Sequence, residues 1–135
     1  MKKLKIYCDG ASKGNPGPSS IGVAVYEADE ETHSISRRIS DGTNNVAEWA
    51  ALEAGLEYCI SQAADEVEAF LDSELVVKQF KGEYKVKSPH LQVAKERVKA
   101  LSSKLKVFII RHVPREKNKR ADKLANLAFE SQNHT

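Results

Sequence analysis

Three short stretches in which polar and apolar residues alternate begin this chain, and they restrict its fold more than any other feature. In residues 3–9, Leu4, Ile6 and Cys8 would share one face of a strand, and comparable segments follow at 20–26 and 34–39. Side chains point to alternate faces of a strand, so this spacing predicts three strands. Because the segments 10–18 and 27–32 between them look like turns, we expect an antiparallel meander.

The remainder of the chain changes to a helical period. From Val46 to Ala63 the apolar residues form one stripe, made of Trp49, Leu52, Leu56, Cys59, Ile60 and Ala63. Further helices are predicted at 73–80, 90–105 and 119–130, and strands at 67–72 and 107–113. A strand that follows a helix usually pairs in parallel with an earlier strand. The order therefore predicts an α/β fold: a five-stranded mixed sheet, three antiparallel strands and then two parallel ones, with helices on both faces.

The length and composition fit one globular domain. With 135 residues, of which 41% are hydrophobic, we expect a single domain over residues 1–130 and a frayed tail over 131–135. No segment approaches the roughly 20 apolar residues that a membrane span needs. The two cysteines are far apart and match no metal-binding spacing, so we expect reduced packing residues and a cytoplasmic location. Nothing predicts an oligomer, and we expect a monomer.

Charge is distributed unevenly along the chain. Residues 1–72 carry a net charge of −7, whereas residues 73–123 carry +10. An acidic half beside a basic half suits a polyanion that is held on one surface and processed at another. A lysine-rich surface that is merely solvated is the alternative explanation.

Four carboxylates occupy positions where a plain fold would not need them. Asp9 closes the first strand, Glu48 borders the inward stripe of the first helix, Asp72 ends the fourth strand, and Asp122 opens the last helix. Each has an ordinary alternative when taken alone, such as a strand-end surface residue or an acid in the first turn of a helix. Glu48 is the least ordinary, because no cation lies three or four residues away to compensate its burial.

Together the four carboxylates indicate a metal site. Ligand sites in open α/β sheets gather at the carboxyl ends of the strands, and the two helices can reach the same edge with their first turns. Hard oxygen donors favour Mg²⁺ or Mn²⁺ over zinc. Two such ions can activate a water and stabilise the leaving oxygen of a phosphodiester. The sequence thus predicts metal-dependent chemistry on a phosphate ester.

Four ordered segments resemble the signature blocks of type 1 ribonuclease H. They are YCDGASKGNPG at 7–17, TNNVAEWAAL at 43–52, LDS at 71–73 and RHVPREKNKRADKLA at 111–125. The resemblance implies a ribonuclease H fold and endonucleolytic cleavage of the RNA strand of an RNA/DNA hybrid with two Mg²⁺ ions. It also implies that the four carboxylates are the metal ligands and catalytic residues.

The same resemblance implies roles for further residues. His112 matches a loop histidine that moves protons or helps product to leave, and an imidazole can do this near neutral pH. The residues implied to contact substrate are Ser12, Asn15, Asn44 and Asn45 in the minor groove of the hybrid, and Thr43 in a pocket for a DNA phosphate. Helix capping is the alternative for Asn44 and Asn45.

One region departs from the family. Some members insert a basic protrusion before the fifth strand, but here the segment is short. A basic-aromatic patch of Lys81, Lys85 and Lys87 with Tyr84 remains there. Of these residues, Lys85 and Lys87 are expected to contact substrate. Other candidates for this task are Lys117, Lys119, Arg120 and Lys123. The short segment leaves two alternatives open: a nuclease of the same fold that also acts on double-stranded RNA or DNA, and a hybrid-binding module without turnover.

Overall fold

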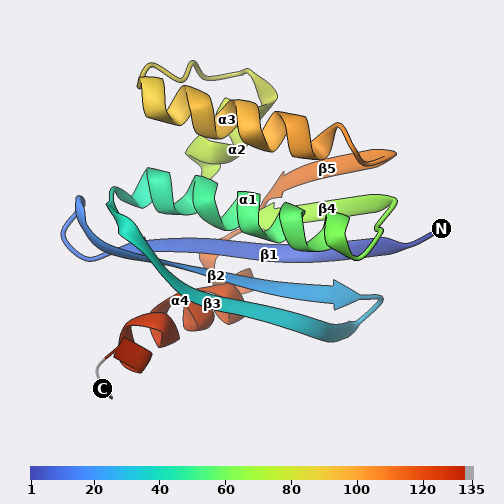
Figure 1. Cartoon of the computed structure of the whole chain (residues 1–135), viewed down its shortest axis with the longest axis horizontal. Coiled ribbons are helices and arrows are strands. Elements are labelled where there is room, and N and C mark those ends of the chain that lie inside the picture. Colours follow the sequence, from blue (N-terminus) through green and yellow to red (C-terminus); the bar gives the residue numbers. More distant parts are fainter. Residues whose placement is uncertain (133–135) are drawn as a thin grey trace.

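The fold is a five-stranded mixed sheet covered by helices on both faces (Figure 1). The computed structural model describes residues 1–132. Its elements are β1 (Lys3–Ser12), β2 (Gly17–Glu27), β3 (Glu30–Gly42), α1 (Asn44–Ser61), β4 (Glu66–Leu71), α2 (Glu74–Lys81), α3 (Pro89–Ser102), β5 (Val107–His112), the 3-10 turn η1 (Arg115–Lys117) and α4 (Lys119–Gln132). The sheet order is β3-β2-β1-β4-β5, antiparallel across β1, β2 and β3 and parallel across β1, β4 and β5. The predicted fold class is confirmed.

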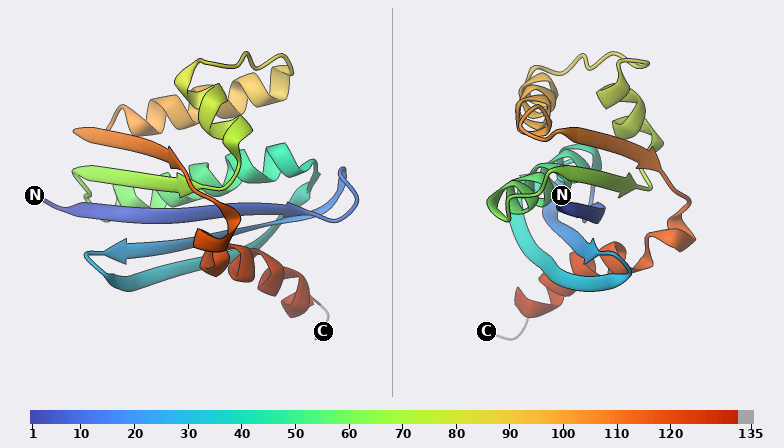
Figure 2. Two further views of the ribbon diagram at one scale, coloured as in Figure 1. Left: turned by 180° about the vertical axis from the view of Figure 1, so that it is seen from behind. Right: turned by 90° about the vertical axis from the view of Figure 1, so that its right-hand side faces the viewer.

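The helices form layers on either side of the sheet. Helix α1 packs on β1 and β2, and α4 packs on the opposite face against β2, β1 and β3 (Figure 2). Helix α3 lies outside α1, so α1 is enclosed between the sheet and a second helix. For this reason α1 buries Ala47, Ala51 and Ala54 in addition to the first four residues of the predicted stripe. The last two differ from the prediction: Ile60 is half-buried, and Ala63 is exposed beyond the end of the helix.

Strand β1 is longer than the sequence pattern suggested. Residues 10–12 were expected to belong to a turn, but they pair with β2, up to Ser12 opposite Ser19. Pairing with β4 ends earlier, at Cys8 opposite Leu71. Asp9 therefore lies where β1 loses its parallel neighbour and keeps its antiparallel one.

Other boundaries also differ from the expectation. Strand β3 extends over Glu30–Gly42, because it pairs with β2 along most of its length and the intervening turn shrinks to two residues. Helix α1 ends at Ser61, and Ala63 adopts a left-handed φ of 58° beyond it. Helix α4 continues through Gln132, and the remainder of the tail, 133–135, lies outside the described residues.

Two glycines allow the helices to approach the sheet closely. A Cβ added to Gly10 would lie 2.2 Å from the carbonyl carbon of Ala47 in α1, and one added to Gly22 would lie 2.1 Å from the carbonyl oxygen of Ala121 in α4. Atoms cannot approach so closely without a shift of the backbone. The absent side chain of Gly10 thus makes room for helix α1.

Both cysteines are free and buried, as expected of packing residues. Within the described part of the chain, no helix is both long enough and apolar enough to cross a bilayer.

Substitution of Gly22 by alanine should displace α4. Because the added methyl group would meet helix backbone, we expect a loss of roughly 2–4 kcal/mol in the free energy of unfolding, measured by urea denaturation. Gly42→Ala is the matched control, since its added Cβ would meet only ordinary contacts at 3.5 Å. Equal stability of the two variants would contradict the close approach of α4.

Candidate active site

Asp9 and Asp72 lie close together because each directly follows one of two residues that are paired across adjacent strands. Cys8 on β1 is opposite Leu71 on β4 in the parallel ladder, and each carboxylate comes next in its own chain segment. Parallel strands bring their carboxyl ends to one edge of the sheet, so the two aspartates lie side by side. The exposed surface of Asp9 is only 7%.

Glu48 reaches the same edge from the first turns of α1. Thr43 caps this helix, its Oγ1 accepting a hydrogen bond from the Val46 amide at 3.2 Å. The amide of Gly10 donates to Glu48 Oε1 at 2.6 Å, which fixes the carboxylate against β1. The other oxygen, Oε2, is buried and has no hydrogen-bond partner in the described part of the chain.

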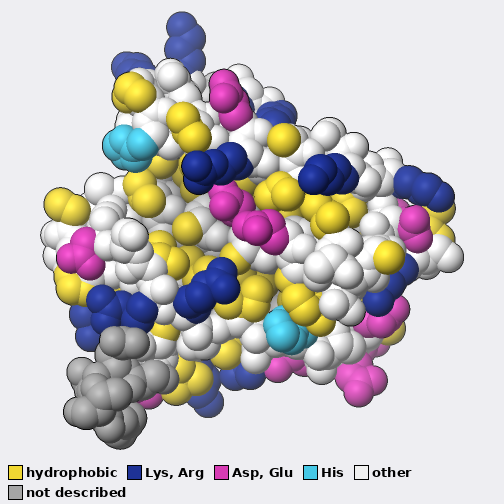
Figure 3. Space-filling view, in the orientation of Figure 1, with side chains coloured by type: hydrophobic (Ala, Val, Ile, Leu, Met, Phe, Trp, Pro, Cys, Tyr) yellow, Lys and Arg dark blue, Asp and Glu magenta, His cyan; other side chains and the backbone are white. Residues whose placement is uncertain are grey.

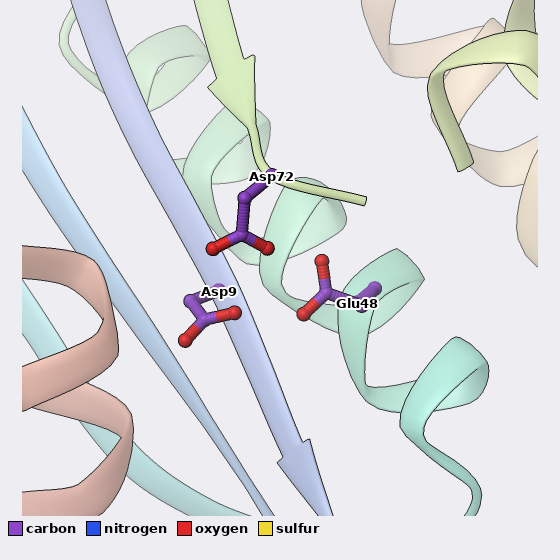
Figure 4. A group of neighbouring side chains, drawn as sticks. All are labelled: Asp9, Glu48 and Asp72. Atoms are coloured by element: carbon purple, nitrogen blue, oxygen red, sulfur yellow. The ribbon is translucent and has the colours of Figure 1, made fainter. Parts of the chain in front are cut away.

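Three of the four predicted carboxylates form a tight group. One oxygen each from Asp9, Glu48 and Asp72 lies within 4.8 Å of the others, and Figure 4 shows the three side chains pointing toward one another. Asp122 is outside this group but lines the same cleft, and it lies close enough to Asp9 to raise the pKa of that carboxyl. The structure thus brings all four to one cleft, with Asp122 at its wall.

Burial and mutual repulsion raise the pKa values of the central pair. Burial raises the pKa of Asp9 from 3.8 to about 7; the adjacent Glu48 carboxyl opposes this shift, and Asp72 and Asp122 add to it. Burial, followed by the neighbouring Asp9, raises the pKa of Glu48 well above its ordinary value. A bound cation would stabilise the ionised form of carboxyl groups whose pKa values are raised in this way.

These residues fit a divalent cation. The donors are carboxylate oxygens, as Mg²⁺ and Mn²⁺ prefer, and the buried Glu48 Oε2 has no other partner among the described residues. A buried charged oxygen without a partner is costly, so a cation at this position would remove the cost.

The predicted substrate contacts surround the carboxylates. The cleft encloses about 890 Å³, and its wall includes all five residues expected to face the hybrid backbone or minor groove, namely Ser12, Asn15, Thr43, Asn44 and Asn45. Hydrogen bonds hold this wall together. The Ser12 amide donates to Asn44 Oδ1 at 3.0 Å, and the Asn44 amide donates to Asn15 Oδ1 at 2.8 Å. Asn45 Oδ1 is buried and unpartnered among the described residues.

A ring in α4 also holds the β1–β2 loop. Lys13 Nζ lies 4.4 Å and Arg38 Cζ 5.1 Å from the centroid of the Phe129 ring. Such cation–π contacts stabilise by about 0.5–1 kcal/mol at exposed positions. Phe129 thus links the loop that carries Asn15 to the helix that carries Asp122.

His112 and the two predicted lysines lie outside this cleft. His112 ends β5 opposite Leu71 and lines a different hollow, together with Phe80, Lys81 and Phe108. Lys85 and Lys87 line a third hollow beside Tyr84 and α3. On the face seen in Figure 3, lysine and arginine side chains are spread over the surface and do not gather in one patch.

The other candidate cations differ in their surroundings. Arg120 is occupied by an ion pair with Glu31, at 2.8 Å. Lys119 lies next to Asp122 in a small hollow, whereas Lys117 lines a hollow that shares no residue with the cleft. Lys123 is exposed on α4.

Two cleft-side residues escaped the sequence analysis. Asn118 is 1% exposed, and its Nδ2 donates to the carbonyl of Cys8 at 2.9 Å and to Asp72 Oδ2 at 3.2 Å. In sequence it looked like a loop residue before a helix. Arg115 lines the cleft and makes no ion pair among the described residues. The available signal in the sequence was that Arg115 lies only seven residues before Asp122.

Comparison with known proteins places this geometry in a family context. The family described as "Reverse transcriptase-like" matches residues 7–128. The bifunctional protein Rv2228c of Mycobacterium tuberculosis is 40% identical over 131 residues, which cover 96% of this chain. The match covers 36% of that relative, so the chain spans about a third of its length.

Solved structures agree over the whole domain. RNase H1 from Halobacterium salinarum is 38% identical with a TM-score of 0.93, covering 96% of this chain and 98% of that one. LC11-RNase H1, solved in complex with an RNA/DNA hybrid, is 39% identical with a TM-score of 0.89, again covering 96% and 98%.

The raised pKa of Asp9 predicts a specific pH dependence. A carboxyl that holds its proton more tightly in the folded state costs stability as pH rises, here between about 4 and 7. In chelator, the stability of Asp9→Asn relative to the wild type should rise by on the order of 1–3 kcal/mol in unfolding free energy between pH 5 and pH 8. Urea melts at both pH values measure this, and Asp41→Asn, an exposed acid, is the control. A pH-independent difference would contradict the shift.

Divalent cations should stabilise the fold by relieving the repulsion. Binding to the native state alone raises its stability in proportion to RT ln(1 + [L]/Kd). We expect 10 mM Mg²⁺ to raise the Tm by about 5 °C over chelator at matched ionic strength, and Glu48→Gln to lose most of this increase. A wild-type Tm that Mg²⁺ leaves unchanged would argue against the cation site.

Proposed function

Because this chain belongs to the ribonuclease H family, we propose that it is an endonuclease that hydrolyses the RNA strand of RNA/DNA hybrids. The observation that carries the proposal is the single cleft in which the carboxylates and the amide-lined wall face each other. The relative that was solved with an RNA/DNA hybrid supports the choice of substrate.

The carboxylates are proposed to hold the metal ions. Asp9, Glu48, Asp72 and Asp122 are the ligands in this proposal, with two Mg²⁺ per site, or Mn²⁺ in their place. When bound, the ions supply an activated water and neutralise charge on the phosphodiester. Glu48 is oriented for this task because Gly10 fixes Oε1 and leaves Oε2 free. Asn118 orients Asp72 in a similar way.

The amide-lined wall is proposed to read the hybrid. Asn45 lines the cleft, and its side-chain amide can donate to a ribose 2′-hydroxyl, which distinguishes RNA from DNA. Asn15, Asn44 and Ser12 form the rest of this surface, held in position by their own hydrogen bonds.

Phosphate contacts are proposed for Thr43 and for the cations. The Thr43 oxygen accepts from the Val46 amide, so its hydroxyl proton remains available to a DNA phosphate. Arg115, which has no ion pair among the described residues, can contact a phosphate at the mouth of the cleft. Lys85 and Lys87 would contact the duplex farther along, since they lie in a separate hollow.

His112 is proposed to move a proton or to assist product release. It is exposed at the end of β5, beside the strand that leads to Asp72. We further propose that the protein acts as a monomer in the cytoplasm, which its two free, buried thiols support.

The removal of one metal ligand should abolish cleavage and leave the fold intact. Loss of groups that only support metal ligands typically costs 10–100-fold in activity, so Asp72→Asn should reduce cleavage of a labelled hybrid by more than about 100-fold. Circular dichroism and the Tm in chelator report the fold, and Asp41→Asn should cleave normally. Undiminished cleavage by Asp72→Asn would overturn the assignment.

The same assay separates the alternatives for substrate. Hybrid, double-stranded RNA and double-stranded DNA of one sequence are compared with and without chelator. Cleavage confined to the hybrid supports the proposal, and cleavage of either other duplex at a similar rate indicates a broader nuclease. Binding without chelator-sensitive cleavage would identify a hybrid-binding module.

A further inference from the structure

The hollow that Lys117 lines, mentioned above, lies on the face of the sheet opposite α1. Leu4, Ile6 and Cys8 of β1 point into the core on the α1 side, so Lys5 and Tyr7, which alternate with them, face the other side. The hollow has a volume of about 340 Å³, within the range of small-molecule sites, and it shares no lining residue with the carboxylate cleft. Its remaining lining residues are Tyr26, Ala28, Asp29, Lys117, Asn118 and Arg120.

Aromatic rings form one wall of this hollow. Tyr7 stacks on Phe70, with ring centroids 4.6 Å apart and an interplanar angle of 12°. Tyr26 stands nearly perpendicular to Tyr7, at 5.6 Å and 80°. In a perpendicular pair only one ring has its face covered by the other. Since Phe70 covers one side of Tyr7, at least one tyrosine face remains uncovered by these partners, and such a face can stack on a planar ring.

Unpaired cations line the same hollow. Lys5 and Lys117 make no ion pair among the described residues, whereas Arg120 is neutralised by Glu31 through contacts of 2.8 and 3.1 Å. The Arg120–Glu31 pair also joins the start of α4 to β3, which gives the hollow a fixed border. Two free ammonium groups beside an aromatic wall favour a ligand that carries both a planar ring and an anionic group.

Asn118 connects this hollow to the carboxylate cleft. It lines the hollow, and its Nδ2 donates across the end of the sheet to Asp72. A ligand that shifts this amide would change the orientation of the Asp72 carboxylate.

We propose that the hollow binds a nucleotide, with the base against the tyrosines and the phosphate between Lys5 and Lys117. The ligand chemistry is that of a 5′-phosphorylated nucleotide, supplied either as a free mononucleotide or as the end of a short strand. This site is separate from the proposed hydrolytic function, and it does not depend on metal ions.

The test is an NMR titration of the ¹⁵N-labelled protein in chelator with adenosine monophosphate. We expect saturable shifts at Tyr7, Tyr26 and Lys117, and weaker binding of adenosine or inorganic phosphate alone. The double variant Lys5→Gln/Lys117→Gln should weaken binding at least about 5-fold, equivalent to roughly 1 kcal/mol. Lys104→Gln/Lys106→Gln removes the same charge at the turn before β5, outside the hollow, and should leave binding unchanged.

Two further arms complete the design. Tyr26→Phe should retain binding and Tyr26→Leu should lose it, and because the titration is run in chelator, failure of the cleavage proposal would not affect this result. A 5′-phosphorylated trinucleotide that binds more tightly than the mononucleotide identifies a strand end as the ligand, and equal binding identifies the free nucleotide. Shifts confined to Asn15 and Asn44, or equal weakening in the control double variant, would overturn the proposal.

Discussion

The repulsion among buried carboxylates is the constraint on which the rest of this structure depends. Asp9, Glu48 and Asp72 are held within a few ångströms, and burial together with mutual repulsion keeps the first two from ionising easily. The fold maintains this arrangement by pressing two helices onto the sheet at Gly10 and Gly22, where no side chain intervenes. The stability lost at this edge is offset by the apolar core behind it, which surrounds Trp49 and Leu52.

Orientation at the site comes from groups that are not themselves ligands. The Gly10 amide holds one oxygen of Glu48, and Asn118 holds Asp72, so each carboxylate has one fixed and one available side. The neighbouring wall is organised in the same way, because the hydrogen bonds among Ser12, Asn15 and Asn44 restrict their motion before any substrate binds. Such pre-organisation lowers the entropy lost on binding.

The sequence predicted the architecture and the meeting of the carboxylates because both follow from local periodicity and parallel pairing. Asp9 and Asp72 could be placed at one edge from strand order alone. The continuation of β1 through residue 12 was missed, since glycine and serine carry turn signals that pairing with β2 overrides. Asn118 contacts Cys8 and Asp72, which are separated from it by 110 and 46 positions in the sequence. Local sequence patterns carry no information about contacts over such separations. The separate hollow beside His112 likewise depends on how α2 packs near β5.

The position of the Phe129 ring between Lys13 and Arg38 has a consequence for how this domain can vary. The last turns of α4 follow Asp122 in the chain and add no residue to the carboxylate cleft beyond Asn126, yet they anchor the tip of the first hairpin. A chain that ended before Phe129 would keep Asp122 and the acidic centre but would release the loop that bears Asn15. If Asn15 contacts the duplex as proposed, the C-terminal turns contribute to how firmly the duplex is held, while the acidic centre carries out the proposed hydrolysis, and the two properties can change independently.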